Sequence, residues 1–203
     1  MSYERLFEFE QALAEFTGAP YAIATDGCTH AIQLCMLYDQ VDCCQFTPYT
    51  YISVPMILIR SGIRFDYLDE TEQTWLGEYQ FLGTRIWDSA RLLRNGMYRP
   101  GQMQCLSFGN SKPLQLGRVG AILLDDAVAY KEISMLRSDG RDLHINPWIT
   151  QRNFPLGYHY SPTLELCALG TERLPQVDQT PKFVKYNDCR RINFYDKTNK
   201  IKH

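Results

Sequence analysis

A lysine and an aspartate, each placed directly after a short apolar run, are the residues of this sequence best suited to covalent chemistry. Lys112 closes a turn after a strand-like segment. A lysine held there can lose its proton more readily than a surface lysine and can then form a Schiff base with a carbonyl, the alternative being an ordinary solvated lysine. Asp88 ends another strand-like segment, where a carboxylate costs desolvation energy unless a cation meets it. That cation is either a protonated ring nitrogen of a ligand or the side chain of Arg85 or Arg91.

Two further turns carry groups that could hold a phosphate and a planar ring. Residues 26–29 precede an apolar helical pattern, and free backbone N–H groups at a helix start, with the Thr29 hydroxyl, suit a phosphate. The alternative is that Thr29 only caps the helix. Tyr51 follows a strand-like segment, where its ring could lie flat on a planar ligand or pack in the core.

The elements that must position these turns alternate along the chain. Helical spacing covers residues 5–16, 31–38, 127–136 and 162–173, and strand-like segments cover residues 21–24, 45–47, 64–68, 85–87, 104–108 and 120–124. This alternation predicts an α/β fold with a mainly parallel sheet flanked by helices. The site of such a fold lies beyond the carboxyl ends of the strands, which is where the four turns fall.

The composition excludes several other classes of protein. The chain has 203 residues, 45% of them hydrophobic, and a net charge of −2, so it has no basic footprint for nucleic acid. No apolar run approaches the roughly 20 residues that span a bilayer, and the first residues do not read as a signal peptide, so we expect a cytoplasmic protein. The seven cysteines lack C-x-x-C spacing and the four histidines are scattered, which favours buried reduced thiols over a metal site.

In this order, the four turns resemble one family, the pyridoxal phosphate (PLP)-dependent sugar aminotransferases named for DegT, DnrJ, EryC and StrS. The resemblance covers about Phe7 to Gln176. It is carried by an opening helix similar to the family's at 9–18, a phosphate-binding segment at 21–32, S-F-x-x-x-K at 107–112, a Gly-rich segment at 117–121, and G-Y-H-Y at 157–160 with an A-L-G at 168–170. It implies a PLP-transferase fold of type I in a reduced version, lacking most of the C-terminal small domain.

The resemblance also implies a role for each site residue. Lys112 would hold PLP as a Schiff base, and Asp88 would pair with the ring nitrogen, which makes these two the catalytic residues. The expected cofactor-binding residues are Cys28, Thr29, Tyr51, Asp88, Arg91, Ser107, Lys112 and His159. Tyr51 would stack on the ring, while Cys28, Thr29 and Ser107 would hold the phosphate.

Four positions depart from the family pattern. Cys28 replaces the Gly that is usual in the family, and Arg91 replaces a Gln or His near the 3′-oxygen of PLP. His159 replaces an Asn, and Ser161 replaces an Arg. The Asn that His159 replaces reaches the cofactor of the neighbouring subunit in the family, so a homodimer with shared active sites is implied.

The function implied is transfer of an amino group from an amino acid, usually glutamate, to a keto-sugar, usually nucleotide-linked. Residues 1–176 would form the PLP-binding domain and residues 177–203 an arm or tail. Because the family's members are nearly twice as long, two alternatives stay open. One is a PLP-dependent decarboxylase or other amino-acid enzyme with a non-sugar substrate, and the other is a non-catalytic relative that binds PLP or a sugar nucleotide.

Overall fold

The computed structural model describes residues 2–180 and 182–195, so the end of the expected C-terminal arm, residues 196–203, lies outside the described residues. The helices are α1 (Glu4–Thr17), α2 (Cys28–Tyr38), α3 (Ser53–Arg60), α4 (Ala127–Arg137) and α5 (Leu164–Arg173). The strands are β1 (Tyr21–Thr25), β2 (Cys43–Phe46), β3 (Arg64–Tyr67), β4 (Tyr79–Gln80), β5 (Ile86–Asp88), β6 (Met103–Ser107) and β7 (Gly120–Leu124). Three short 3-10 helices lie at Trp148–Thr150, Leu174–Gln176 and Cys189–Arg191.

Local sequence signals set the ends of the main helices. Gly18 ends α1 in the left-handed conformation, with φ of 75°, and its N–H donates to the carbonyl of Ala14. The Asp126 side chain caps α4 by accepting hydrogen bonds from two backbone N–H groups. The Thr163 hydroxyl caps α5 by accepting a hydrogen bond from the backbone N–H of Leu166. These are ordinary N-cap and C-cap interactions, whereas α1, α2 and α3 begin without a side-chain cap.

The central sheet has five strands in the order β1-β7-β6-β5-β4, and β2 and β3 form a separate parallel pair. Strands β5 and β6 are parallel, whereas β7 is antiparallel to both of its neighbours and β4 is antiparallel to β5. The α/β class is confirmed, but the sheet is mixed and not mainly parallel, because three of the four described pairings of the central sheet are antiparallel. Strand β4 returns antiparallel because only residues 81–85 separate it from β5, which is too short for the crossover that a parallel pair needs.

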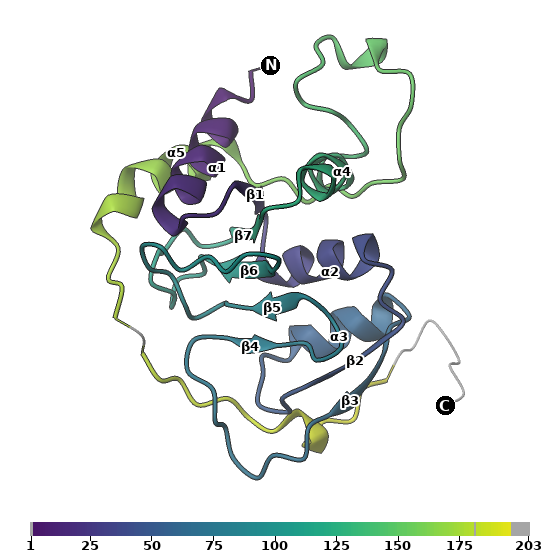
Figure 1. Cartoon of the computed structure of the whole chain (residues 1–203), viewed down its shortest axis with the longest axis vertical. Helices are drawn as coiled ribbons and strands as arrows, with labels where there is room; N and C mark the ends of the chain where they lie inside the picture. Colours follow the sequence, from purple (N-terminus) through teal and green to yellow (C-terminus); the bar gives the residue numbers. More distant parts are fainter. Residues whose placement is uncertain (1, 181, 196–203) are drawn as a thin grey trace.

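The sheet is covered by helices on both faces (Figure 1). Helices α1 and α5 pack on one face, and α2 and α4 on the other. Successive residues of a strand face opposite sides, and β7 shows this clearly. Ile122 and Leu124 belong to the core under α2 and α4, while Ala121 and Leu123 belong to the core under α1 and α5. The buried strands therefore read as continuous apolar runs.

Two segments leave this layered body. Residues 139–160 form a long excursion after α4 with several exposed apolar side chains, namely Trp148, Ile149, Phe154 and Leu156. The chain after α5 instead runs back along the sheet to the region of β2 and β3 (Figure 1). In the described part of the chain, no helix is long and apolar enough to cross a membrane.

Candidate functional site

A pocket of about 670 Å³ lies at the edge of the sheet where β1, β5 and β6 end. Because β7 and β4 run in the opposite direction, their first residues meet the same edge. The strand register pairs Gly120 with both Thr25 and Ser107, and it pairs Tyr79 with Asp88. The pocket thus receives groups from the ends of some strands and from the beginnings of others.

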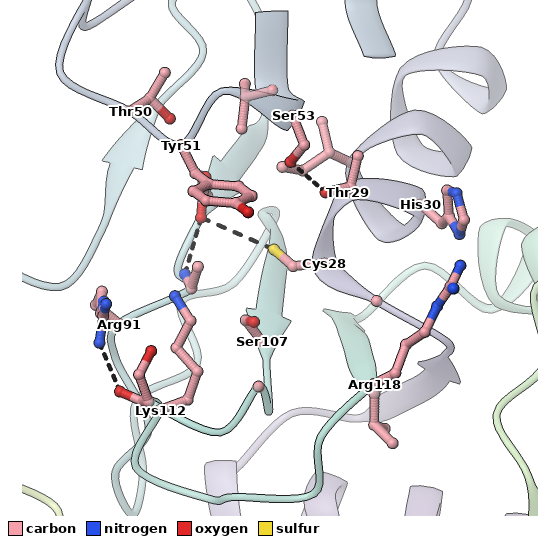
Figure 2. Close-up of a pocket in the computed structure, with 18 of the residues that line it drawn as sticks. Cys28, Thr29, His30, Thr50, Tyr51, Ser53, Arg91, Ser107, Lys112 and Arg118 are labelled. Carbon is pink, nitrogen blue, oxygen red and sulfur yellow. Dashed lines mark hydrogen bonds between the residues drawn. The ribbon is translucent and has the colours of Figure 1, made fainter. Parts of the chain in front are cut away.

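Lys112 and Asp88 face this pocket together. Figure 2 shows the Lys112 side chain pointing into the pocket, with Arg91 beside it and Cys28 across from it. The turn that carries Lys112 is closed by its own N–H donating to the carbonyl of Gly109 at 2.9 Å. The Lys112 ammonium and the Asp88 carboxylate are near enough for each to act on the other's pKa.

Asp88 is buried, and each of its oxygens accepts a hydrogen bond. Its Oδ2 accepts from the Tyr79 hydroxyl at 2.8 Å, and its Oδ1 accepts from the Ala90 N–H at 2.9 Å. Burial raises the pKa of this carboxyl, and the hydrogen bonds from Tyr79 and Ala90 and the charge of Lys112 oppose that rise. Neither arginine considered as its partner pairs with it.

Those arginines are held elsewhere. Arg85, which precedes β5 whereas Asp88 ends it, pairs with Asp39 at 2.8 Å and does not line the pocket. Arg91 lines the pocket but donates its Nη1 to the carbonyl of Ser111 at 2.6 Å. Asp88 therefore presents its negative charge to the pocket without an ion pair among residues 2–180 and 182–195.

Burial and charge together favour the neutral amine of Lys112. Burial lowers its pKa most, and the nearby positive charge of Arg91 lowers it further. Asp88 and Cys28 act in the opposite direction. A neutral amine is the form of a lysine that can attack a carbonyl, so this environment suits a nucleophilic lysine.

Helix α2 begins at the pocket without a side-chain cap. Its N-cap is Gly27, and Thr29 lies inside the helix with its hydroxyl 2.6 Å from Ser53 Oγ, as Figure 2 shows. The capping interpretation of Thr29 was therefore wrong. An uncapped helix start offers backbone N–H groups and the positive end of the helix dipole to an anion.

Gly120 fixes the position of that helix start. A Cβ at Gly120 would lie 2.5 Å from the Cys28 nitrogen and from the Gly27 carbonyl carbon, and 2.8 Å from the Leu106 oxygen. These neighbours are all backbone atoms, so only a residue without a side chain lets α2 pack this closely on β7.

The expected cofactor-binding residues fall into two groups. Seven of them line the pocket: Cys28, Thr29, Tyr51, Asp88, Arg91, Ser107 and Lys112. Tyr51 is 63% exposed, so it does not pack in the core. His159 does not line the pocket; its side chain is 86% exposed and lies 3.0 Å from Asp139. Its role toward a neighbouring subunit stays a prediction.

Sequence reasoning missed several pocket residues, among them His30, Trp75, Tyr79, Arg118 and Tyr186. Tyr79 has no motif around it, and only its register opposite Asp88 reveals it. Tyr186 lies in the segment expected to be an arm. His30 and Arg118 both contact Asp26, at 2.5 and 3.3 Å, and neither spacing is a recognisable signal.

The family comparison agrees with this geometry. The model of the DegT/DnrJ/EryC1/StrS aminotransferase family matches residues 1–82 and 96–185. The chain belongs to this family. The match includes Lys112 and the start of α2 but omits residues 83–95, so the placement of Asp88 and Arg91 rests on the structure. No curated protein sequence matches this DegT-family chain.

Solved structures share the fold. PseC from Helicobacter pylori is 16% identical with a TM-score of 0.66, covering 85% of this chain and 58% of PseC. NtdA from Bacillus subtilis, solved with the cofactor PMP, is 19% identical with a TM-score of 0.70, covering 84% of this chain and 47% of NtdA. The sugar aminotransferase CalS13 from Micromonospora echinospora is 15% identical with a TM-score of 0.65, covering 85% and 61%. This DegT-family chain thus spans about half to three fifths of their length.

Proposed function

We propose that this chain binds PLP covalently, as a Schiff base with Lys112, and moves an amino group from an amino acid to a keto-sugar. The observation that carries the proposal is the single pocket that Lys112 and Asp88 face, with the uncapped start of α2 at its side. The solved relatives support the substrate class, because CalS13 is a sugar aminotransferase and PseC is an aminotransferase in pseudoaminic acid biosynthesis.

The residues fit the cofactor. The pocket's volume is in the usual range for cofactor and small-molecule sites. The N–H groups at the start of α2 and the hydroxyls of Thr29 and Ser107 would hold the phosphate. The buried carboxylate of Asp88 would keep the ring nitrogen protonated, and Tyr51 would cover the ring. When bound, PLP supplies the electron sink that stabilises negative charge at the substrate carbon.

Lys112 then has a second task. Its Nζ lies in a partly buried site, and its pKa is lowered. As a neutral amine it would take the proton from the Cα of the amino-acid donor. Glutamate is the donor we propose first, and a nucleotide-linked keto-sugar the acceptor.

A spectroscopic experiment tests the proposal. The full chain incubated with PLP should gain a visible absorption band that survives dialysis, and Lys112→Ala should lose it. Lys131→Ala, which removes an exposed lysine of α4, is the matched control and should keep the band. A wild-type chain that stays colourless contradicts the proposal.

The same sample separates the alternatives. Labelled glutamate should yield 2-oxoglutarate and bleach the band if the chain is an aminotransferase. Release of carbon dioxide would instead indicate a decarboxylase. A bound cofactor that no amino donor converts would indicate a non-catalytic binding protein.

A further inference from the structure

One corner of the pocket is built from segments outside the family match. Arg91 lies in the unmatched stretch 83–95, and Tyr186 follows directly after the last matched residue. Tyr186 stacks on Trp75 with ring centroids 5.4 Å apart, and the Arg91 guanidinium lies 5.9 Å from the centre of the Tyr186 ring. All three residues line the pocket that Lys112 faces.

The guanidinium of Arg91 is fixed in place beside Lys112. Its Nε donates to the Tyr186 hydroxyl at 3.2 Å, and its Nη1 donates to the Ser111 carbonyl at 2.6 Å. Because Ser111 precedes Lys112, the second bond ties the guanidinium to the turn that carries the lysine. Figure 2 shows this bond and the two side chains next to each other.

Tyr186 is itself held by a second pair of hydrogen bonds. Its N–H donates to Gln73 Oε1 at 2.9 Å, and Gln73 Nε2 donates to the carbonyl of Val184 at 3.1 Å. Gln73 thereby fixes the segment around Tyr186 against the loop that carries Trp75. The hydroxyl that orients Arg91 is thus placed by the fold.

The positive charge of this corner has no counterion of its own. Within the ranges 2–180 and 182–195, Arg91 forms no ion pair with a carboxylate, and both of its hydrogen bonds go to neutral oxygens. An arginine charge without a carboxylate partner at a partly buried position favours an anionic ligand beside it. These two hydrogen bonds use Nε and Nη1 of Arg91, so Nη2 can donate to such a ligand.

We propose that Arg91, oriented by Tyr186, binds the carboxylate of the amino-acid substrate. The amino group of that substrate then lies toward Lys112. The inference rests on the proposed function and names a specificity residue for it. A planar guanidinium fork matches a carboxylate with two parallel hydrogen bonds. The start of α2, which would take a phosphate, belongs to a different part of the pocket wall (Figure 2).

Glutarate is a suitable probe, because it has the two carboxylates of glutamate and no amino group to react. Calorimetric titration of the PLP-treated full chain should show glutarate binding, and Arg91→Gln should weaken it by at least about tenfold, as expected when a hydrogen-bonded charge pair is removed. Arg91→Lys should lose part of the affinity, and Tyr186→Phe should lose less than Arg91→Gln.

The matched control is Arg94→Gln, the same change at an exposed arginine three positions along the same segment, which should leave glutarate affinity unchanged. Visible absorption and thermal unfolding of each variant show that the fold and PLP uptake are intact. If the wild type fails to bind glutarate, or if Arg91→Gln binds it as the wild type does, the carboxylate subsite is wrong.

Two outcomes separate this inference from the proposed function. A chain that takes up no PLP but binds glutarate through Arg91 contradicts the proposed function alone. A chain that gains the visible band but shows no Arg91-dependent glutarate binding contradicts the inference alone. If inorganic phosphate displaces glutarate and Arg91→Gln loses both to the same extent, Arg91 belongs to a phosphate site and the inference is overturned.

Discussion

The Asp88 carboxylate is held by a short chain of hydroxyl groups. The Tyr79 hydroxyl donates its one proton to Asp88 Oδ2. The Thr50 hydroxyl, 2.5 Å from the Tyr79 hydroxyl, must therefore be the donor in the bond between them. Chains of this kind support a buried charge that burial alone would neutralise. Burial, together with the nearby charge of Asp88, raises the pKa of Tyr79 well above its ordinary value, so its proton stays available for the bond.

Tyr79→Phe tests this arrangement. We expect the free energy of unfolding to fall by about 1–3 kcal/mol at neutral pH, because a buried acceptor loses its donor. The folded-state pKa of Asp88 is already raised by burial and rises further in the variant. The loss is therefore largest above that pKa and shrinks as the pH falls through it. Denaturant titrations at several pH values measure the difference.

Tyr67→Phe is the matched control for that experiment. The Tyr67 hydroxyl is buried and has no hydrogen-bond partner among the described residues. Its removal should leave the free energy of unfolding unchanged or slightly increased. Equal losses in the two variants would show that Tyr79 acts through packing and not through Asp88.

The titration of Lys112 gives a second residue-scale prediction. Arg91→Gln removes a positive charge that lowers the Lys112 pKa, so this pKa should rise toward its ordinary value. Asp88→Asn removes a negative charge that raises it, so the pKa should fall further. The pH dependence of Lys112 acetylation in the PLP-free chain, followed by mass spectrometry with exposed Lys131 as internal reference, reports both. Shifts in the same direction would refute the assignment.

At the scale of elements, the contact between α2 and β7 decides where an anion can bind. Gly120→Ala should push the start of α2 away from the strand, because its Cβ meets backbone atoms on three sides. We expect a loss of about 1–3 kcal/mol in unfolding free energy and a much weaker affinity for PLP. Thermal unfolding and equilibrium dialysis with PLP measure the two effects.

Gly27→Ser provides the comparison for that variant. A Cβ at Gly27 meets no atom within 4 Å, and serine is a better N-cap than glycine. The serine hydroxyl would accept a hydrogen bond from a backbone N–H at the start of α2. That N–H would then no longer be free to donate to a phosphate. The variant should keep or gain a few tenths of a kcal/mol in stability while losing PLP affinity. If stability and PLP affinity fell together in both variants, the two effects would not be separable, and the assignment of anion binding to the start of α2 would be contradicted.

The sequence predicted the main elements because their signals are local. The spacing of Leu6, Phe9 and Leu13 predicts α1, and the apolar run 120–124 gives β7 with its observed bounds. Strand β4 could not be found in this way, since two residues carry no periodicity and their pairing with β5 is set by the short turn. The mixed pairing of the sheet likewise depends on contacts that are distant in sequence.

Site residues that belong to a local sequence motif could be predicted. Site residues that reach the pocket only through tertiary contacts could not. Lys112, Asp88 and the 26–29 turn each follow a strand, so strand ends locate them. Six of the seven cysteines are buried and only Cys43 is exposed, which agrees with the expectation of buried thiols. Tyr186 reaches the pocket through a returning segment, and nothing in its neighbours along the sequence indicates that path.

At the scale of the whole molecule, the segment around Tyr186 and residues 139–160 differ in whether they line the pocket. The segment around Tyr186 closes one wall within the chain. The excursion at 139–160 carries exposed apolar side chains and an exposed His159, and none of these residues lines the pocket. An exposed apolar excursion of this kind is a common interaction surface. We propose that a second copy of this chain covers it and brings His159 to the partner's pocket.

Subunit complementation tests the shared site. In a symmetric dimer, one subunit's Lys112 and the other's His159 would meet in each pocket. A mixed dimer of Lys112→Ala and His159→Ala subunits then holds one pocket with both substitutions and one with neither. Mixing the two inactive variants should restore about a quarter of the wild-type rate of 2-oxoglutarate formation, since about half of the dimers are mixed. If both residues served the same subunit's pocket, mixing would restore nothing.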